Sequence, residues 1–429
     1  MAEERVFGDL LRRYRVAAGM TQEELAERAG LSVEGISTLE RGARRAPRRD
    51  TLRLLAEALG LSKQDRQALV SAGGRRDERS SPSQDLLPNN LPPQPTPFIG
   101  REQEVGDVRQ QLVRPDLRLL TLTGPGGIGK TRLALEAAAG VLEEFPDGVY
   151  FVPLAPIADP SLVVPTIART LGLAEAGARP IAETLVEHLR GRRMLLVLDN
   201  FEHLLEAVSE VASLLLSCPR LAVLATSRAC LRLRGEQEYP VPPLELPEAR
   251  HLTDLALLSR NQSVAIFVQG AAAVKPGFAV TSQTAPAIAA ICRKLDGLPL
   301  AIELAAARVR LFPPQVLLAR LDSRLKLLTG GAKDLPERQQ TLRSCIGWSY
   351  DLLGESEKAL FRSLAVFVGG CSLEAIEAIC DPEGELDALE GVESLAEKSL
   401  LRQEEEVGRE PRFVMLETWR DPRKLIQVL

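Results

Sequence analysis

The sequence predicts a multidomain protein of the α and α/β classes, in which an all-α head precedes a larger body built on a mainly parallel sheet. The 429 residues exceed the size at which one hydrophobic core stops growing, about 250 residues. Helical periodicity fills residues 1–72, whereas apolar strands alternate with helical stretches after residue 97. That alternation is typical of a parallel α/β sheet. A proline-rich segment, 73–97, separates the two regions.

The charge of the chain is unevenly distributed. Residues 1–80 carry 16 lysines and arginines against 13 acids, and the rest of the chain carries 37 against 45. A basic head therefore precedes an acidic body, although the net charge is −5. A local excess of positive charge favours an anionic partner for the head.

The sequence also indicates in which cellular compartment the protein is expected. No apolar run approaches the roughly 18 residues that a membrane helix needs, and the N-terminus lacks the features of a signal peptide. We therefore expect a cytoplasmic protein with no membrane partner. The six cysteines lie without close pairs and without metal-site spacing, which favours reduced structural thiols.

The head carries the local signals of two helices joined by a short turn. Thr21 and Glu24 have the spacing of a capping box at the start of one helix, and Ser32 is placed to cap the next. Gly30 is suited to end the first helix. A turn at Gly30 and Leu31 between these helices matches the spacing of a helix-turn-helix.

The stretch TQEELAERAGLSVEGISTLERG resembles the lambda-repressor-like (XRE-type) family, and the resemblance covers residues 7–71. It implies that 1–72 form a DNA-binding domain whose second motif helix enters the major groove of double-stranded DNA. Ile36 and Leu39 would then face the core, and Gln22 would lie near a backbone phosphate. The groove-facing residues would be Ser32, Val33, Glu34 and Ser37.

A cluster of arginines follows the motif: Arg41, Arg44, Arg45, Arg48 and Arg49. We expect these side chains to contact DNA phosphates, which supplies affinity without sequence information. The same residues also fit a small helical bundle with a solvated basic face, or a head that binds protein. We expect the following linker, 73–97, to be semi-extended because it is rich in proline, and to hold the head away from the body.

Residues 124–131, GPGGIGKT, match the G-x-x-x-x-G-K-[ST] phosphate loop. An apolar strand at 119–123 precedes them and a helix-forming stretch follows, which is the context that a phosphate loop requires. Glycines let the backbone wrap around phosphate, and the helix start adds positive potential. We expect Lys130 to contact the β- and γ-phosphates of ATP and Thr131 to bind Mg²⁺. The predicted nucleotide-binding set here is Gly124, Gly126, Gly127, Ile128, Gly129, Lys130, Thr131 and Arg132.

Two later strands end in polar residues that suit the same chemistry. The strand 194–198 runs into Asp199, which is placed to bind Mg²⁺. Asn200 follows where a faster ATPase often has a second carboxylate. Because an amide cannot take a proton from water, we expect slow turnover. The strand 221–226 leads to Arg228, whose fixed charge could sense a γ-phosphate.

Five motifs in order, FIGRE (98–102), GPGGIGKT, LLVLDN, LAVLATSR and GLPLAIELAAARVR (297–310), resemble the NB-ARC-type STAND ATPases, particularly their bacterial regulators. The resemblance implies a P-loop domain at 98–245, a helical subdomain at 246–335 and a winged helix at 336–418. It also implies that Pro299 approaches the nucleotide, and that the adenine is framed by Phe98, Ile99, Gly100 and Arg101. The family rests closed with ADP and opens with ATP, which implies self-association on ATP binding.

The C-terminal part departs from that family. Met415, Leu416 and Glu417 stand where the family usually has a histidine that contacts ADP phosphate. The tail 419–429 is charged, and the helical repeats that serve as sensor in the family do not follow, so we expect a truncated or frame-shifted end. An unknown signal or sensor partner would then be needed.

The sequence therefore predicts a sequence-specific transcriptional regulator of the STAND class that ATP and ADP switch, with ATP/ADP and Mg²⁺ as cofactors and at most slow ATPase activity. Lys130, Asp199, Asn200 and Arg228 would carry the chemistry, and Thr131 and Asp199 would hold the metal. Two other classes fit the same motifs less well. One is a signalling or defence scaffold that oligomerises on ATP and uses its head for protein contact, and the other is a motor ATPase.

Overall fold

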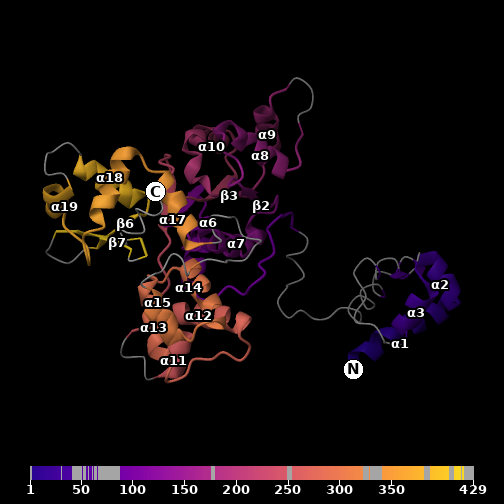
Figure 1. Ribbon diagram of the computed structural model, residues 1–429. Coiled ribbons are helices and arrows are strands. Elements are labelled where there is room, and N and C mark those ends of the chain that lie inside the picture. Colours follow the sequence, from indigo (N-terminus) through magenta and orange to yellow (C-terminus); the bar gives the residue numbers. More distant parts are fainter. Residues whose placement is uncertain are drawn as a thin grey trace. The chain divides into compact units, whose positions relative to one another are not determined.

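A computed structural model gives the structure of residues 2–29, 31–40, 51, 55–56, 58–59, 61, 65, 87–174, 179–248, 254–321, 328, 341–380, 387–404, 410–416 and 418–419. The chain separates into two compact units, Met1–Ser83 and Gln84–Leu429, which we call unit 1 and unit 2. Their helices and strands are labelled in Figure 1.

Unit 1 is helical and has its own core. Its helices are α1 (Ala2–Ala17), α2 (Gln22–Ala29) and α3 (Val33–Glu40). Leu11, Leu25 and Ile36 are fully buried, and Leu39 is nearly so, which confirms the predicted core face of α3.

Both predicted N-caps of unit 1 are present. The Thr21 N–H donates to the Glu24 carboxylate at 2.7 Å, and the Glu24 N–H donates to Thr21 Oγ1 at 3.2 Å, so the capping box is confirmed. Ser32 Oγ accepts from the Gly35 N–H at 3.1 Å. Gly30 lies outside the described residues.

A buried ion pair ties α1 to α3. Arg15 Nε lies 2.6 Å from Glu40 Oε1, and the Gln22 amide donates to Glu40 Oε2 at 2.6 Å. The two charged side chains are only 12% and 4% exposed. Burial favours the neutral acid, but hydrogen bonds from Arg15 and Gln22 outweigh it and hold the pKa of Glu40 below its usual range.

Unit 2 is built on a parallel five-stranded sheet with the order β2-β3-β4-β1-β5. The strands are β1 (Leu119–Thr123), β2 (Val149–Pro153), β3 (Met194–Asp199), β4 (Leu221–Thr226) and β5 (Glu236–Pro240). The sequence predicts the first four. It misses β5 because this edge strand reads EQEYP and is largely exposed, so it has no apolar signal.

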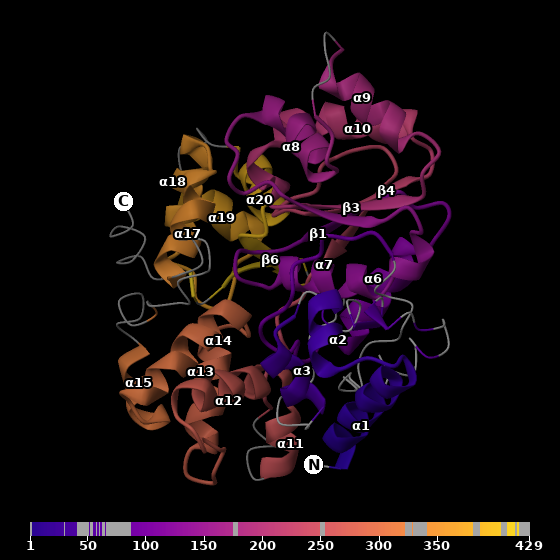
Figure 2. The same cartoon turned by 90° about the vertical axis from the view of Figure 1, so that its right-hand side faces the viewer.

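Alternate residues of each strand enter cores on opposite faces of the sheet. In β3, Leu195 and Val197 pack on one face, and Leu196 and Leu198 on the other. Figure 2 shows one face covered by α6 (Glu102–Leu112) and α7 (Lys130–Ala139). The opposite face is covered by α8 (Val163–Thr170), α9 (Ile181–Leu189) and α10 (Val208–Ser217).

Two further parts of unit 2 follow the sheet. The helical subdomain contains α11 (Leu255–Arg260), α12 (Gln262–Val274), α13 (Ala285–Lys294), α14 (Pro299–Ala306) and α15 (Pro314–Arg320). The winged helix contains α17 (Leu342–Asp351), α18 (Glu355–Leu364), α19 (Leu373–Cys380), α20 (Ala388–Glu397), β6 (Leu401–Glu404) and β7 (Arg412–Met415). The last two form the antiparallel hairpin that the sequence predicts. Within the described residues, no helix combines the length and apolarity needed to cross a membrane.

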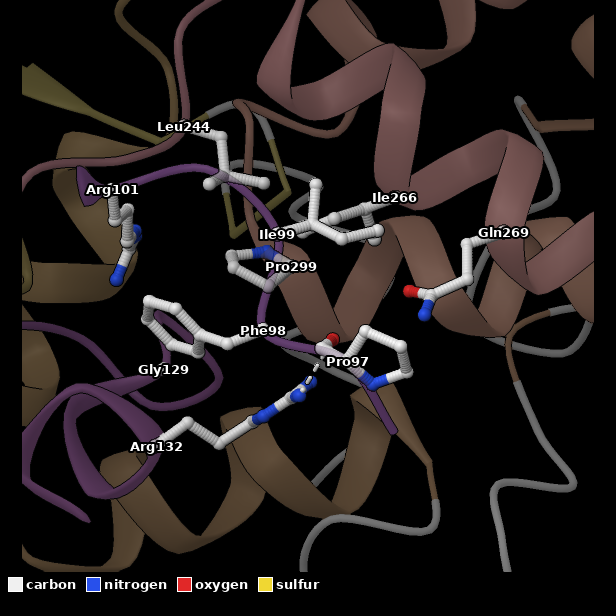
Figure 3. Close-up of a pocket in the computed structure, with 10 residues that line it drawn as sticks. All are labelled: Pro97, Phe98, Ile99, Arg101, Gly129, Arg132, Leu244, Ile266, Gln269 and Pro299. Carbon is white, nitrogen blue, oxygen red and sulfur yellow. Dashed lines mark hydrogen bonds between the residues drawn. The ribbon is translucent and has the colours of Figure 1, made fainter. Parts of the chain in front are cut away.

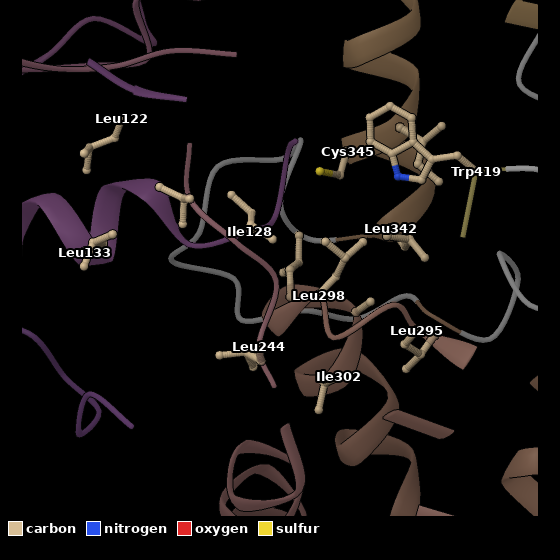
Figure 4. Close-up of a cluster of buried hydrophobic side chains, with 14 of the residues drawn as sticks. Leu122, Ile128, Leu133, Leu244, Leu295, Leu298, Ile302, Leu342, Cys345 and Trp419 are labelled. Atoms are coloured by element: carbon tan, nitrogen blue, oxygen red, sulfur yellow. The ribbon is translucent and has the colours of Figure 1, made fainter. Parts of the chain in front are cut away.

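The cores of all three parts meet beside the phosphate loop. Figure 4 shows Ile128 of the loop next to Leu298, which precedes α14, and Leu342 and Cys345 of α17. These side chains belong to one continuous cluster and are at most 5% exposed. The loop is therefore packed against parts of the chain that lie more than 150 residues away in sequence.

The second half of the predicted linker lies against the sheet rather than apart from it. Asn90 exchanges two hydrogen bonds with the backbone of Phe151, and Pro88 O accepts from the Val149 N–H at 2.9 Å. Arg132 donates to the carbonyls of Thr96 and Pro97. Free backbone carbonyls of a proline-rich segment suit this edge contact, because proline removes donors and leaves acceptors. Residues 73–86 lie outside the described part of the chain.

We expect Glu40→Gln to lower the free energy of unfolding of unit 1 by about 1.5 kcal/mol, because it replaces charge-assisted hydrogen bonds from Arg15 and Gln22 by weaker ones. The folded pKa of Glu40 is depressed, so its stabilisation is complete above the ordinary value of 4.5 and is lost as the pH falls through the folded value. Urea unfolding of residues 1–83 at pH 7 and pH 3 measures both effects. The exposed Glu27→Gln is the control, and equal effects of the two variants would contradict the assignment.

Candidate functional site

The phosphate loop between β1 and α7 has a backbone that favours glycine. Gly124, Gly127 and Gly129 have φ values of 145°, 80° and 96°, in the region that L side chains rarely adopt. Gly129 precedes the first residue of α7, so the loop ends at a helix N-terminus. This is the local geometry that presents backbone N–H groups to phosphate.

The helical subdomain and the winged helix both lie close to this loop. A Cβ added to Gly127 would lie 3.0 Å from Leu300 of α14, and one added to Gly126 would lie 2.7 Å from the thiol of Cys345 on α17. Leu300 also donates its N–H to Gly127 O at 3.2 Å. The helical subdomain and the winged helix therefore both contact the loop directly.

Lys130 is buried in the loop. Its ammonium donates to the carbonyl oxygens of Gly124 at 2.6 Å and Pro125 at 3.2 Å. Burial lowers the pKa of Lys130 to about 8, and the nearby carboxylate of Glu202 opposes this only in part. A buried cation held by carbonyl dipoles is suited to a phosphate anion.

The two residues predicted to bind metal lie side by side. Thr131 Oγ1 donates to Asp199 Oδ1 at 2.6 Å, and Thr226 donates to the same oxygen at 2.7 Å. One hydroxyl and one carboxylate at the phosphate loop fit Mg²⁺, which keeps several waters and binds phosphates as well. In the part of the chain that the structure describes, no group of three or more His, Cys, Asp or Glu could hold a metal ion by itself.

A mainly apolar hollow adjoins the loop. Figure 3 shows Pro299 beside Phe98, with Arg132 below. Its lining is Pro97, Phe98, Ile99, Arg101, Gly129, Arg132, Leu244, Ile266, Gln269 and Pro299. Of the predicted nucleotide-binding residues, the lining includes Phe98, Ile99, Arg101, Gly129, Arg132 and Pro299 but not Gly100. Leu244, Ile266 and Gln269 also line it, although they belong to none of the predicted motifs.

The FIGR segment is held in an unusual backbone conformation. Gly100 and Arg101 have φ values of 67° and 64°, and a Cβ on Gly100 would lie 2.7 Å from Gln262. Arg101 is buried, its guanidinium donates to Pro242 O at 2.7 Å, and burial lowers its pKa. Positive φ at a buried arginine is the kind of strain that functional sites retain.

A charged group lies where β3 and β4 end. Asn200, with a φ of 66°, donates its side-chain amide to Glu202 Oε1 at 3.1 Å, and Arg228 Nε lies 3.3 Å from the same oxygen. Arg228 Nη2 would lie 3.3 Å from a Cβ on Gly126, so the guanidinium also faces the phosphate loop. Glu202 is not among the predicted site residues, although an acid within the run FEHLL, directly after the strand that ends at Asp199, is a signal in the sequence.

The winged helix contacts the segment that follows β4. Ser399 Oγ donates to Arg228 O at 2.7 Å, and Arg232 pairs with Glu397. On another side of the winged helix, the Thr418 N–H donates to Asp296 of the helical subdomain at 2.8 Å. Met415 and Leu416 pack into or against the core, and Glu417 lies outside the described residues.

The candidate DNA-binding residues are described only in part. Val33 is 43% exposed at the start of α3, Ser32 caps that helix, and Ser37 lies on it half-buried. Gln22 donates to Glu40 instead of pointing freely outward. The Glu34 side chain and the arginines at 41, 44, 45, 48 and 49 lie outside the described residues.

Three domain models match this chain. They are described as a helix-turn-helix at residues 11–65, an AAA domain at 116–239 and a winged helix-turn-helix domain at 353–421. The predicted helix-turn-helix, P-loop domain and winged helix are thereby confirmed. An AAA domain is a nucleotide-binding domain, and a helix-turn-helix is a DNA-binding one.

Several curated proteins are similar to it. The protein named "Putative HTH-type transcriptional regulator Mb0914c" of Mycobacterium bovis is 43% identical over 309 residues, which cover 71% of this chain and 33% of that protein. The uncharacterized protein Mb0918 of the same organism is 42% identical over 285 residues, covering 66% and 69%. The regulatory protein AfsR of Streptomyces griseus is 30% identical over 380 residues, covering 82% and 36%. The chain spans about a third of the length of the first of these relatives.

We expect Lys130→Ala to weaken ADP binding at least about tenfold, because it removes a charged hydrogen-bond donor from the phosphates. The melting temperature of the empty protein should stay the same or rise, since burying this ammonium opposes folding. Calorimetric titration and thermal unfolding measure the two quantities. Lys275→Ala, at an exposed lysine, is the control, and a large loss of stability would show that Lys130 is mainly structural.

Proposed function

We propose that this chain, which belongs to the same family as the mycobacterial protein Mb0918, is a transcriptional regulator of the STAND class. Unit 1 binds double-stranded DNA with sequence specificity, and exchange of ADP and ATP in unit 2 switches its state. Activity is regulatory, with slow ATP hydrolysis at most.

The observation that carries the proposal is the position of the phosphate loop. The loop is contacted by Leu300 of the helical subdomain and by Cys345 of the winged helix, and the nucleotide-facing hollow includes Pro299. A ligand at the loop therefore touches or adjoins three parts of unit 2. Nucleotides that differ in one phosphate can favour different arrangements of these parts, but only by their difference in affinity for them.

Each candidate residue has a role that follows from its position. The N–H groups of the loop and Lys130 bind phosphates, Thr131 and Asp199 hold Mg²⁺, and Arg228 faces the third phosphate. The bound nucleotide and metal supply the charge to which these groups respond. Asn200 can orient a water but cannot accept its proton, so hydrolysis is slow enough for the bound nucleotide to act as a signal.

The winged helix is the part that transmits the change. Ser399 holds the backbone of Arg228, so a shift of this arginine toward a γ-phosphate also shifts the winged-helix contact. To invert a population of 1:99 the two nucleotides must differ by about 5.5 kcal/mol in their preference for the two states. ATP binding then opens unit 2 for self-association, which changes the spacing of the DNA-binding heads.

The sizes of the ADP and ATP forms test the switch. We expect the chain with a non-hydrolysable ATP analogue and Mg²⁺ to sediment as a larger species than the chain with ADP, because opening exposes contacts between copies. Sedimentation velocity at equal protein concentration measures this. Lys130→Ala is the control and should give one size with both ligands. Identical sizes for the parent protein would refute the nucleotide-coupled self-association.

Salt dependence tests DNA binding by the head. Arg44→Ala together with Arg45→Ala should weaken binding to duplex DNA of any sequence, and reduce the slope of log affinity against log salt by about 2. Fluorescence anisotropy at several salt concentrations gives the slope. Arg114→Ala with Arg179→Ala removes the same charge from exposed positions of unit 2 and should leave the slope unchanged. An unaltered slope in the head variant would favour a head that binds protein.

A further inference from the structure

Glu202 belongs to no motif in the proposed function, yet its carboxylate lies inside the nucleotide site. The side chain is 5% exposed, and Oε1 accepts from Arg228 Nε at 3.3 Å and from the Asn200 amide at 3.1 Å. Among the described residues, Glu202 Oε2 and Arg228 Nη1 are buried atoms without a hydrogen-bond partner. Buried polar atoms left open in this way are usually completed by a ligand or by water.

The carboxylate is charged in this position. Burial favours the neutral acid, but the charges of Arg228 and Lys130 outweigh it and hold the pKa of Glu202 below its usual range. Glu202 is also the first of the acids that raise the pKa of Lys130. An internal anion therefore pairs with Arg228 and also acts on the charge of Lys130, the two cations assigned to the phosphates.

A diphosphate and a triphosphate meet this anion differently. The loop backbone and Lys130 can bind the β-phosphate while Arg228 stays with Glu202. To bind Arg228, a γ-phosphate has to draw this side chain away from Glu202. Otherwise the γ-phosphate lies beside the Glu202 carboxylate, in a place where little water screens the two negative charges. Like charges in a desolvated site repel strongly, so either arrangement opposes the third phosphate and leaves the second unaffected.

We propose that Glu202 sets the preference of this site for a nucleoside diphosphate over a triphosphate, by acting as an internal anion that occupies the cations of the γ-phosphate. This inference rests on the proposed nucleotide switch and names the residue that keeps it in the diphosphate state. Glu202 is thus a specificity-determining residue. Its carboxylate stabilises the resting state until a higher triphosphate concentration or another signal outweighs it.

The test compares affinities in the full chain. Dissociation constants for ADP and for the β,γ-imido analogue of ATP, both with Mg²⁺, are measured by calorimetry for the parent, Glu202→Gln and Glu206→Gln. Glu202→Gln keeps the shape and removes the charge, so it should bind the analogue about tenfold more tightly while ADP affinity stays nearly constant. Glu206→Gln, exposed four residues away, should leave both affinities unchanged.

Each other outcome is decisive. A parent-like ratio of affinities in Glu202→Gln overturns the proposal. If the ratio is parent-like and Glu202→Gln also hydrolyses ATP more slowly than the parent, Glu202 acts on the attacking water instead. A parent chain that binds neither nucleotide overturns the proposed function and this inference with it. If thermal unfolding shows that Glu202→Gln is unfolded, the double variant with Arg228→Gln is compared with Arg228→Gln alone, and removal of the Glu202 charge in that pair must raise the affinity for the ATP analogue relative to ADP. An unchanged ratio there overturns the proposal as well.

Discussion

The phosphate loop has no free space for side chains at Gly126 and Gly127, and the rest of unit 2 is arranged around that constraint. Leu300 and Cys345 come from helices far along the chain, and they lie within 3.0 Å of where Cβ atoms on Gly127 and Gly126 would be. Close packing of this kind makes the loop sensitive to small displacements, because packed interiors shift between discrete arrangements instead of deforming continuously. A ligand that widens the loop must therefore move α14 and α17, which belong to different parts of the unit.

Buried charged side chains also lie around the phosphate loop. Lys130, Arg101 and Arg228 are all buried near the loop, with Glu202 as a buried acid among them. Buried charges with incomplete partners oppose folding, so such a cluster is retained where a ligand completes it. The same cluster is connected to the winged helix, because Ser399 Oγ donates a hydrogen bond to the backbone carbonyl of Arg228. Arg228, which follows β4, thus takes part both in the packing around the loop and in the buried charge cluster.

Unit 1 is held together by a separate set of contacts. Its helices close around a core of their own, the Arg15–Glu40 pair fixes α1 against α3, and the two caps define where α2 and α3 begin. Its fold therefore depends on contacts within residues 1–83, whereas the nucleotide site depends on contacts across most of unit 2. A chain with these two units can change the arrangement within unit 2 without disturbing the contacts that hold unit 1 together.

The sequence by itself determined the features that are encoded in short contiguous windows. These are the caps of α2 and α3, the strands β1 to β4, the phosphate loop with Lys130, and the order of motifs that indicates the family. Local propensity and glycine geometry fix such features before any long-range contact forms. Only the tertiary structure decided the rest. The polar edge strand β5 is defined by its partner β1, and the hollow gains Leu244 and Gln269 from distant segments. Residues 88–90 lie along the edge strand β2, and Glu202 lies beside Arg228. Each of these depends on which residues the fold brings together, and a sequence pattern cannot express that spatial information.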